Sequence, residues 1–425
     1  MRNKKVNSEK FRIDVKELKK GFRRKDMNER IEKMKSLAKD HLTKKILPFW
    51  ESLKDEENGG YYGYMDFDLK IDKEAVKGCI LNSRIMWFFA NAAVTLNDES
   101  IMPYAKHAYD FMKKNCVDYE NGGVFWSVKY NGEPEDTTKH TYNQAFSIYA
   151  LSSYADAVKH FNGDEKEAEE ALKLAFDLEK NIETRMKDDK GYLEAFKINF
   201  EPESNEKLSE NGVMAEKTMN TLLHVFEAYT ELYRVTKDAA TAEHLRWIFD
   251  IFEKKVYNHK LHRQEVFFDK DWNSIIDLHS YGHDIETSWL MDRGCEVLGD
   301  AKVTATIDPI STDLADKIYN RAYVNHSLLN ECEKGVDNTT RIWWVQAETV
   351  LGFLNAYRKT NEERYLAAAE DVLNYILTKL TDPRDGSEWY WCLDENDKPV
   401  TEKPIVEPWK CPYHNGRMCM EIIKY

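Results

Sequence analysis

The sequence predicts an all-α protein folded as an (α/α)6 barrel, a ring of six helical hairpins with short β-hairpin excursions in its loops. Two observations predict this fold. Apolar residues recur at helical spacing through most of the 425 residues. One turn motif also recurs six times, at intervals of roughly 60–70 residues. A repeat of that length holds two helices and their connections, so six repeats form six hairpins.

Helical periodicity is clearest in three stretches of the chain. Residues 31–42, 145–154 and 223–232 each place apolar side chains three or four positions apart, which is the spacing of one helix face. Alternation typical of strands is confined to short pieces near turns. Because no linker rich in Pro, Gly or Ser interrupts the pattern, we expect one catalytic domain over residues 29–425, preceded by a basic N-terminal arm over residues 1–28.

The recurring turn contains Gly or Asn, which supply the positive φ that tight turns need. Three copies are clear: Glu57–Tyr61, Glu120–Val124 and Asp188–Tyr192. Three weaker copies complete the set: His259–Phe267, His326–Glu331 and Asp385–Trp391. A closed ring of six such units has its inner helices in the core and the loops of one end around a pocket. We therefore expect the functional site at that end.

Composition argues against several classes of protein. A net charge of −14 and a pI of about 5.5 argue against a nucleic-acid partner or an anionic membrane surface. The 7 cysteines lack CxxC spacing, which indicates reduced thiols in the cytoplasm rather than a disulfide framework or a zinc site. The chain has no apolar run of about 18 residues, so no membrane span is expected. The 11 Trp and 23 Tyr fit either an aromatic core or a carbohydrate-binding groove.

Several polar side chains stand near the start of apolar helices, where an unpaired charge is costly. Arg84 enters one such helix and needs either a structural ion pair or an anionic ligand, in which case its guanidinium would stabilise a substrate oxyanion. Tyr142 begins another helix and is either a hydrogen-bond donor to a ligand or a packed core residue. Asn220 and His224 lie one turn apart on one helix face, where His224 is either a satisfied core histidine or a pocket residue.

His283 and Glu286 lie three residues apart, so a helix places them on one face. The carboxylate of Glu286 would then set the tautomer of the imidazole and raise its basicity. A metal site is the alternative, since Glu and His at helical spacing ligate iron in some helical bundles. Such a site needs three or more ligands, and no second pair of this kind appears in the sequence. We therefore expect neither a metal nor another cofactor.

Aromatic side chains cluster late in the chain. The adjacent Trp343 and Trp344 allow one ring to face a pocket while the other packs in the core. The segment Glu407–Arg417 holds Trp409 and His414 among Pro and Gly residues close to the C-terminus. Chain ends usually fray. So dense a group of aromatic and titratable residues therefore indicates that the end folds back into a site, where aromatic faces bind sugar rings and a histidine titrates near neutral pH.

From residue 29 to the end, the sequence resembles the cellobiose 2-epimerases, which belong to the N-acylglucosamine 2-epimerase superfamily. Two features depart from the family: the arm before residue 29 is longer, and the loop Cys332–Thr340 differs. The segments that carry the resemblance occur in order along the chain: Pro48–Trp50, Tyr61–Tyr64, Gly78–Phe89, His140–Phe146, Asn220–Glu227, Ser280–Trp289, Trp343–Glu348 and Trp409–Arg417.

The resemblance implies an (α/α)6 barrel with its site in the central cleft. The catalytic residues that it implies are the acid/base pair His283 and His414, together with His224, Arg84 and Glu286. The substrate-binding residues that it implies are Tyr142, Asn220, Trp343, Trp344 and Trp409. The implied substrate is a β-1,4-linked disaccharide of the cellobiose, lactose or mannobiose type, and no cofactor is implied.

The implied reaction inverts C2 of the reducing-end sugar and converts its glucose form to the mannose form. Ring opening exposes an aldehyde that makes the C2 proton acidic, and two opposed proton carriers are then needed to change faces. His283 and His414 fit this pair, with Arg84 and His224 in electrostatic roles. Three alternatives stay open. The first is a mannobiose 2-epimerase or a monosaccharide epimerase or isomerase of the same superfamily. The second is an inverting glycoside hydrolase with two carboxylates on the same barrel. The third is a non-enzymatic sugar-binding or regulatory protein.

Overall fold

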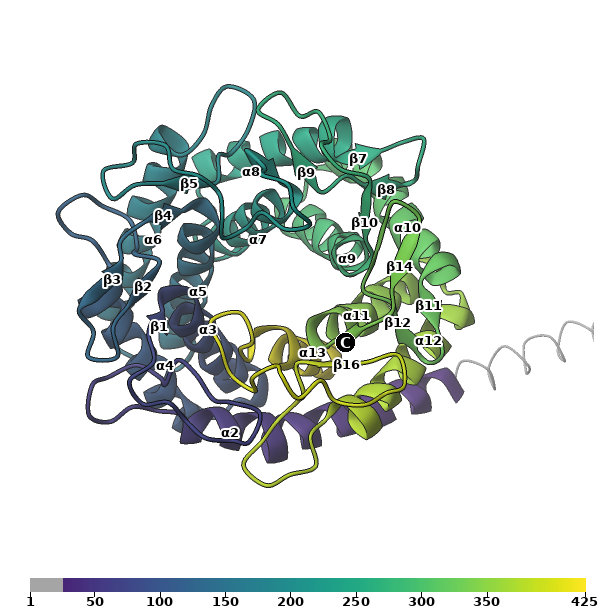
Figure 1. Ribbon diagram of the computed structural model, residues 1–425, viewed down its shortest axis with the longest axis horizontal. Helices are drawn as coiled ribbons and strands as arrows, with labels where there is room; N and C mark the ends of the chain where they lie inside the picture. Colours follow the sequence, from purple (N-terminus) through teal and green to yellow (C-terminus); the bar gives the residue numbers. More distant parts are fainter. Residues whose placement is uncertain (1–25) are drawn as a thin grey trace, which may run out of the picture.

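The helices of the protein form two concentric rings around a central axis (Figure 1). The computed structural model describes residues 26–425, so the expected basic arm lies outside the described residues except for its last three, which are helical. The inner ring consists of α3 (Cys79–Leu96), α5 (Thr141–His160), α7 (Met219–Thr236), α9 (Tyr281–Leu298), α11 (Trp343–Thr360) and α13 (Tyr413–Lys424).

The outer ring alternates with the inner ring along the chain. It consists of residues 26–41 continued by η1 (Leu42–Ile46) and α2 (Leu47–Ser52), then α4 (Met102–Phe111), α6 (Glu165–Arg185), α8 (Ala239–Ile251), α10 (Ala301–Arg321) and α12 (Glu363–Tyr375). The last inner helix, α13, packs between α11 and α3 and so closes the ring. The predicted all-α (α/α)6 barrel is confirmed.

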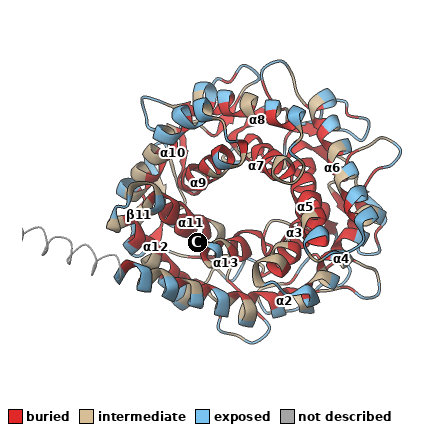
Figure 2. Cartoon of the chain, turned by 180° about the vertical axis from the view of Figure 1, so that it is seen from behind, coloured by how far each residue is buried: buried red, intermediate tan, exposed pale blue. Residues whose placement is uncertain are grey.

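Burial differs between the two rings, as Figure 2 shows. Outer helices bury one stripe; in α6 this stripe runs from Ala168 to Ile182 at spacings of three and four residues. Inner helices are buried on nearly all sides, because they contact the outer ring, both neighbours and the site. One of them, α3, is long and apolar enough to cross a membrane by length and mean hydropathy, but 78% of it is buried inside the fold. It is therefore accounted for as a core helix.

All six predicted turns follow an outer helix and close a short antiparallel hairpin. This holds for the three weaker copies as well as for the clear ones, so the repeat seen in the sequence is a repeat of structure. The paired residues that close the hairpins are Lys54–Tyr61, Val117–Val124, Lys187–Tyr192, Tyr257–Gln264, Tyr323–Leu328 and Thr381–Trp389.

In the first three hairpins, an aspartate binds the backbone of its turn and a lysine that leads into the next inner helix. In the first, Asp55 accepts hydrogen bonds from the N–H groups of Glu57 and Asn58 and from the fully buried Lys77. Each pair joins the end of an outer helix to the entry of an inner one. The three pairs are Asp55–Lys77 at 2.6 Å, Asp118–Lys139 at 2.9 Å and Asp188–Lys217 at 2.6 Å.

Short strands fix where the inner helices begin. Within residues 26–425, β1, β4, β6, β10 and β15 lead directly into α3, α5, α7, α9 and α11. The hairpin β13–β14 covers most of the loop Cys332–Thr340 and pairs with β10. The strands are β1 (Lys77–Gly78), β2 (Ser127–Val128), β3 (Pro134–Asp136), β4 (Lys139–His140), β5 (Ala195–Phe196), β6 (Lys217–Thr218), β7 (Tyr257–Asn258), β8 (Arg263–Gln264), β9 (Phe267–Phe268), β10 (Leu278–Ser280), β11 (Tyr323–Val324), β12 (Ser327–Leu328), β13 (Glu331–Glu333), β14 (Val336–Asn338), β15 (Arg341–Ile342) and β16 (Cys392–Leu393).

The remaining short elements are one 3₁₀ turn and three further π-helical turns. The π-helical turns continue outer helices, as η1 does, and each ends where a hairpin begins. These elements are η2 (Glu99–Ile101), η3 (Met112–Cys116), η4 (Phe252–Val256) and η5 (Ile376–Leu380).

Candidate active site

The N-terminal turns of the six inner helices meet at one end of the barrel, because an outer helix that runs back precedes each inner helix. Nine of the ten residues singled out from the sequence lie in these turns, and the tenth, Trp409, lies in the segment that leads into α13. The fold therefore gathers them all. The nine are Arg84 on α3, Tyr142 on α5, Asn220 and His224 on α7, His283 and Glu286 on α9, Trp343 and Trp344 on α11, and His414 on α13.

His414 is held by a carboxylate from the neighbouring helix. Its Nδ1 lies 2.7 Å from Oε1 of Glu348, and the side chain is 7% exposed. The second oxygen of Glu348 accepts a hydrogen bond of 2.9 Å from Nε1 of Trp289. An ionised carboxylate only accepts hydrogen bonds, so it fixes the proton of neutral His414 on Nδ1 and leaves Nε2 as the free base.

A second pair of the same kind forms on α7. Nδ1 of His224 lies 3.0 Å from Oε2 of Glu227, and the hydroxyl of Tyr413 donates to the same oxygen. His224 and Glu227 are three residues apart, which is the helical spacing that brings side chains together. The sequence therefore contained a signal for this pair, although Glu227 was not predicted to act there.

The guanidinium of Arg417 lies between the two pairs. Its Nη2 donates to Oε1 of Glu286 at 2.6 Å and to Oε1 of Glu348 at 2.7 Å, while its Nη1 donates to Glu227. Arg417 is 1% exposed, so these are buried, charge-assisted hydrogen bonds. Neither Arg417 nor Glu348 was assigned a role from the sequence.

His283 has a different partner from the one that the sequence suggested. Its Nδ1 lies 2.7 Å from the hydroxyl of Ser280, whereas Glu286 is bound to Arg417. The expectation that Glu286 sets the tautomer of His283 is therefore wrong. The helical spacing does place both on one face of α9, but the guanidinium offers the buried carboxylate a charged partner, which an imidazole does not match.

Burial controls the charge of the histidines. It lowers the pKa of His283 to about 3, with His224 and His414 adding to the effect. Burial, together with Arg417 and Arg84, holds the pKa of His414 well below its usual value. Burial also lowers the pKa of His224, although Glu227 opposes it. All three imidazoles are therefore neutral in the free protein at neutral pH.

The three carboxyl groups around Arg417 do not carry equal charge. Burial acts to raise the pKa of Glu227, but Arg417 and His224 outweigh it and bring this pKa to about 2. Burial raises the pKa of both Glu286 and Glu348. The pKa of Glu286 lies well above the usual range, because burial and the neighbouring carboxylate of Glu348 both raise it. Glu348 accepts from three donors, whereas Oε2 of Glu286 has no partner among the described residues. A proton shared by this pair therefore lies on Glu286.

Arg84 has no anionic partner among the described residues. Its guanidinium donates to the hydroxyl of Tyr142 at 2.7 Å and to the carbonyl of Trp409 at 3.5 Å, and it stacks 3.9 Å from the ring centre of Phe146. The side chain is 2% exposed. Of the two sequence interpretations, the structure favours a cation available for a substrate oxyanion over a structural ion pair.

The two adjacent tryptophans divide their roles. The half-buried ring of Trp344 lies 4.8 Å from the ring of His283 and 5.6 Å from that of His414. Trp343 is buried and packs against Trp391 at 4.7 Å. Gly282 leaves room for Trp344, because a Cβ there would lie 2.5 Å from its ring. Trp344 is therefore the tryptophan whose ring lies beside both predicted proton carriers.

The C-terminal segment is anchored beside the site, as the sequence suggested. Buried Glu388 accepts a hydrogen bond of 2.5 Å from Lys410 and another from Asn415, the residue after His414. Trp409 lies half-buried, 5.9 Å from the ring of Tyr142. On the facing helix α7, Oδ1 of Asn220 has no hydrogen-bond partner among the described residues.

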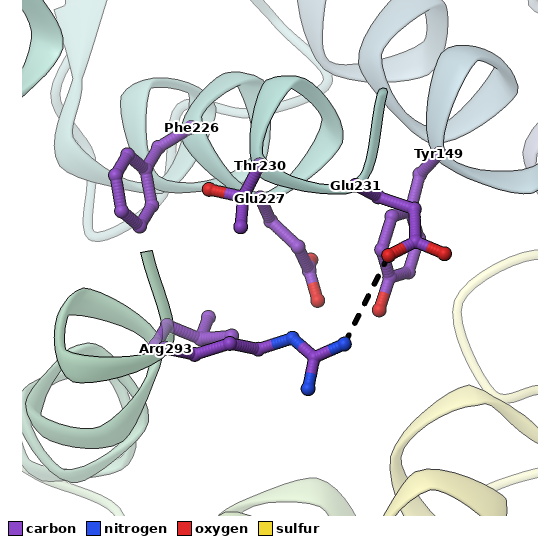
Figure 3. A pocket seen from close by; sticks show the side chains of 7 residues that line it. Tyr149, Phe226, Glu227, Thr230, Glu231 and Arg293 are labelled. Carbon is purple, nitrogen blue, oxygen red and sulfur yellow. Dashed lines mark ion pairs between the residues drawn. The ribbon is translucent and has the colours of Figure 1, made fainter. Parts of the chain in front are cut away.

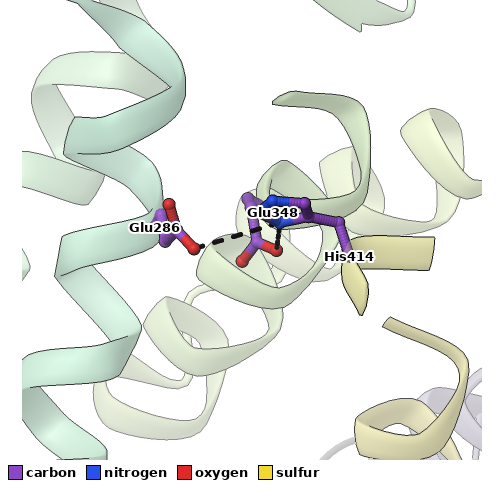
Figure 4. Close-up of side chains that lie close together, drawn as sticks. All are labelled: Glu286, Glu348 and His414. Atoms are coloured by element: carbon purple, nitrogen blue, oxygen red, sulfur yellow. Dashed lines mark hydrogen bonds and ion pairs between the residues drawn. The ribbon is translucent and has the colours of Figure 1, made fainter. Parts of the chain in front are cut away.

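Three groups near Arg417 have the composition of a metal site. Glu286, Glu348 and His414 offer ligand atoms that lie within 4.8 Å of one another, and Figure 4 shows them turned toward a common point. However, Nη2 of Arg417 donates to the same Oε1 atoms of both carboxylates. The positive charge that a metal ion would supply is already present as a guanidinium.

One end of the helical barrel holds buried histidines, an arginine without an anionic partner among the described residues, and tryptophan rings. These side chains are typical of an enzyme that acts on carbohydrates by proton transfer. The model of the N-acylglucosamine 2-epimerase family matches residues 60–415. The chain belongs to this family. It is 51% identical over 399 residues to a cellobiose 2-epimerase from Eubacterium cellulosolvens, covering 90% of this chain and 96% of that protein.

Solved structures agree with this assignment. A sugar epimerase from a ruminal bacterium matches with a TM-score of 0.89 and 46% identity, over 92% of this chain and 98% of that one. An α-mannanase of glycoside hydrolase family 76 from Bacteroides thetaiotaomicron matches with a TM-score of 0.58 and 12% identity, over 93% and 96% of the two chains, which shows a shared fold alone. The predicted family and the predicted class of carbohydrate epimerase are confirmed.

Proposed function

We propose that the protein is a cellobiose 2-epimerase, which inverts C2 of the reducing-end glucose of a β-1,4-linked disaccharide. The observation that carries the proposal is that His283 and His414, from different helices, both lie beside the ring of Trp344, at 4.8 and 5.6 Å between ring centres. The high identity to the cellobiose 2-epimerase of Eubacterium cellulosolvens supports the same substrate class.

The reaction requires proton transfer on both faces of C2. Once the sugar ring opens, the C1 aldehyde makes the C2 proton acidic, and one neutral imidazole removes it. The other imidazole takes up a proton from solvent and delivers it to the opposite face of C2, while the first releases the proton that it removed to solvent. The reverse reaction exchanges their roles. Negative charge that develops on the enediolate raises the pKa of both imidazoles, so each becomes able to hold a proton during turnover.

The surrounding residues support the charged intermediate and the sugar. The guanidinium of Arg84 is suited to stabilise the enediolate oxygens, and the hydroxyl of Tyr142 orients Arg84. His224 joins Arg84 in this role when Nε2 also carries a proton, because Nε2 of the neutral Nδ1–H tautomer only accepts hydrogen bonds. The rings of Trp344 and Trp409 offer faces for the two sugar units. Asn220 supplies a carbonyl oxygen that can accept a hydrogen bond from a sugar hydroxyl.

The arrangement of carboxylates argues against a hydrolase. An inverting hydrolase needs two separated carboxyl groups, with room for water at one of them. Here Glu227, Glu286 and Glu348 all converge on Arg417, so none stands opposite another across a sugar-sized space. Mannobiose or a monosaccharide as the preferred substrate is an outcome that the assay below distinguishes. We also propose a cytoplasmic location, supported by the seven free cysteines.

Incubation with cellobiose in D₂O tests the function. We expect 4-O-glucosylmannose to accumulate with deuterium at C2, because the proton removed exchanges with solvent through the histidines. NMR and mass spectrometry of the sugars are the measurement, with mannobiose, lactose and glucose as parallel substrates. Glucose released from cellobiose without any C2 epimer would contradict the proposal and favour a hydrolase. Turnover of mannobiose alone, or of glucose alone, would identify that sugar as the substrate in place of cellobiose.

Chelation tests the metal-free reaction. We expect EDTA to leave the epimerisation rate unchanged, because Arg417 already neutralises the carboxylates that would bind a cation. The initial rate is measured before and after dialysis against EDTA. A rate that falls on chelation, and that Mg²⁺, Mn²⁺ or Zn²⁺ then restores, would show that a metal takes part.

A further inference from the structure

Arg417 joins four inner helices at one buried point. The residue lies on α13, and its guanidinium contacts Glu227 on α7, Glu286 on α9 and Glu348 on α11. Each carboxylate is at most 4% exposed. Removing one partner from a buried ion pair is costly, so Arg417 contributes to the stability of the ring. Its geometry also connects it to the chemistry.

Two of these carboxylates are the groups that orient imidazoles. Glu227 contacts Nδ1 of His224 through Oε2 at 3.0 Å and Arg417 through Oε1. Glu348 is shared more closely, since its Oε1 accepts from both Nδ1 of His414 at 2.7 Å and Nη2 of Arg417 at 2.7 Å. A continuous chain of hydrogen bonds therefore runs from His224 through Arg417 to His414.

We infer that Arg417 is a positioning residue for the reaction, which acts by holding Glu227 and Glu348 as ionised acceptors so that His224 and His414 both present Nε2 to the sugar. The inference rests on the proposed function for its kinetic consequences. The tautomers themselves do not depend on which sugar is turned over. Groups in the shell around a catalytic side chain commonly change activity about 10–100-fold when removed.

Charge gives the sign of the expected pH effect. The positive guanidinium disfavours a second positive charge on a nearby imidazole, so its loss raises the pKa of His414 and His224. The acid limb of kcat/KM, where the base becomes protonated, then moves to higher pH. The other charged or titratable groups that face these two imidazoles are Arg84, Tyr142, Glu227, His283, Glu286, Glu348 and Tyr413.

The chain offers a matched control in Arg293, a second arginine inside the ring. Its guanidinium lies 3.8 Å from Glu231 and 3.7 Å from Glu421, beside a small cavity that Tyr149 and Thr230 also line (Figure 3). Arg293 contacts neither of the carboxylates that hold imidazoles. Arg293→Gln therefore removes an arginine of the inner ring with longer, more exposed ion pairs, without touching the chain from His224 to His414.

The kinetic test compares Arg417→Gln, Arg417→Lys and Arg293→Gln with the wild type. For Arg417→Gln we expect kcat to fall about 10²-fold with KM changed less than about threefold, and the acid limb to rise by about one pH unit or more. Arg417→Lys keeps the charge and should retain the wild-type pH profile, with kcat between the two. Arg293→Gln should lower the melting temperature and leave kcat and the pH profile unchanged. An Arg417→Gln enzyme with the wild-type pH profile, or a profile that Arg293→Gln shifts equally, would overturn the inference.

Nitrogen NMR of ¹⁵N-histidine-labelled protein tests the same point without any turnover. His224→Asn and His414→Asn assign the two signals. We expect Nδ1–H tautomers for both in the wild type, and mixed tautomers once Arg417 is replaced by the neutral Gln, or by Met if the Gln variant does not fold. Nε2–H tautomers in the wild type, or unchanged tautomers in the variant, would overturn the inference. If the tautomers match but no sugar is epimerised, the proposed function fails and the role of Arg417 in orienting the imidazoles stands.

Discussion

His283→Ala and His414→Ala are each expected to lower the epimerisation rate about 10²–10⁴-fold or more while the fold stays intact. Each variant removes one of two proton carriers that the reaction needs on opposite faces of C2. The measurement is the initial rate of epimer formation together with the melting temperature of the same sample. If these were only packed core histidines, the loss of activity would follow the loss of stability.

A matched variant separates proton transfer from substrate binding. Trp409→Ala removes an aromatic ring at the edge of the site but no titratable group, so we expect a weaker apparent affinity with part of the turnover retained. A His414→Ala protein that epimerises at nearly the wild-type rate would remove the C-terminal segment from the mechanism.

Glu348→Gln is expected to lower kcat about 10²-fold, because the amide cannot serve as an ionised acceptor for both His414 and Arg417. The variant keeps nearly the same volume, so packing is preserved. Rates and melting curves are again measured on the same samples. Trp289→Phe is the control, since it removes the hydrogen bond to the other oxygen of Glu348 but keeps an aromatic ring beside Arg417. If Trp289→Phe and Glu348→Gln were equally impaired, the loss would be structural.

The fold could be predicted from the sequence because its signals are local and repeated. Every turn motif marks the end of an outer helix, and even the weak copy at His326–Glu331 overlaps one of the six hairpins. The position of the site was also predictable, because parallel inner helices begin at one end. Pairs within one helix turn, such as His224 and Glu227, can be recognised in the sequence from their i, i+3 spacing.

The rest of the site depends on contacts between distant helices, which spacing does not reveal. Arg417 and Glu227 are 190 positions apart, and His414 and Glu348 are 66 apart. The i, i+3 spacing of His283 and Glu286 was misleading for this reason. The carboxylate of Glu286 accepts a hydrogen bond from Arg417 on α13, and the imidazole of His283 contacts the hydroxyl of Ser280. The roles given to the ten site residues stay predictions until the variants are measured.

The two-histidine reaction is tested most directly by hydrogen exchange at C2 in D₂O, catalysed by the single-histidine variants. Cellobiose and its mannose-form epimer are supplied separately to His283→Ala and to His414→Ala, and deuterium at C2 is followed by NMR. Each variant keeps one base on one face, so we expect one variant to exchange only the glucose form and the other only the mannose form, without interconverting them. Exchange of the same epimer by both variants, or epimerisation by either at the wild-type rate, would contradict two opposed proton carriers.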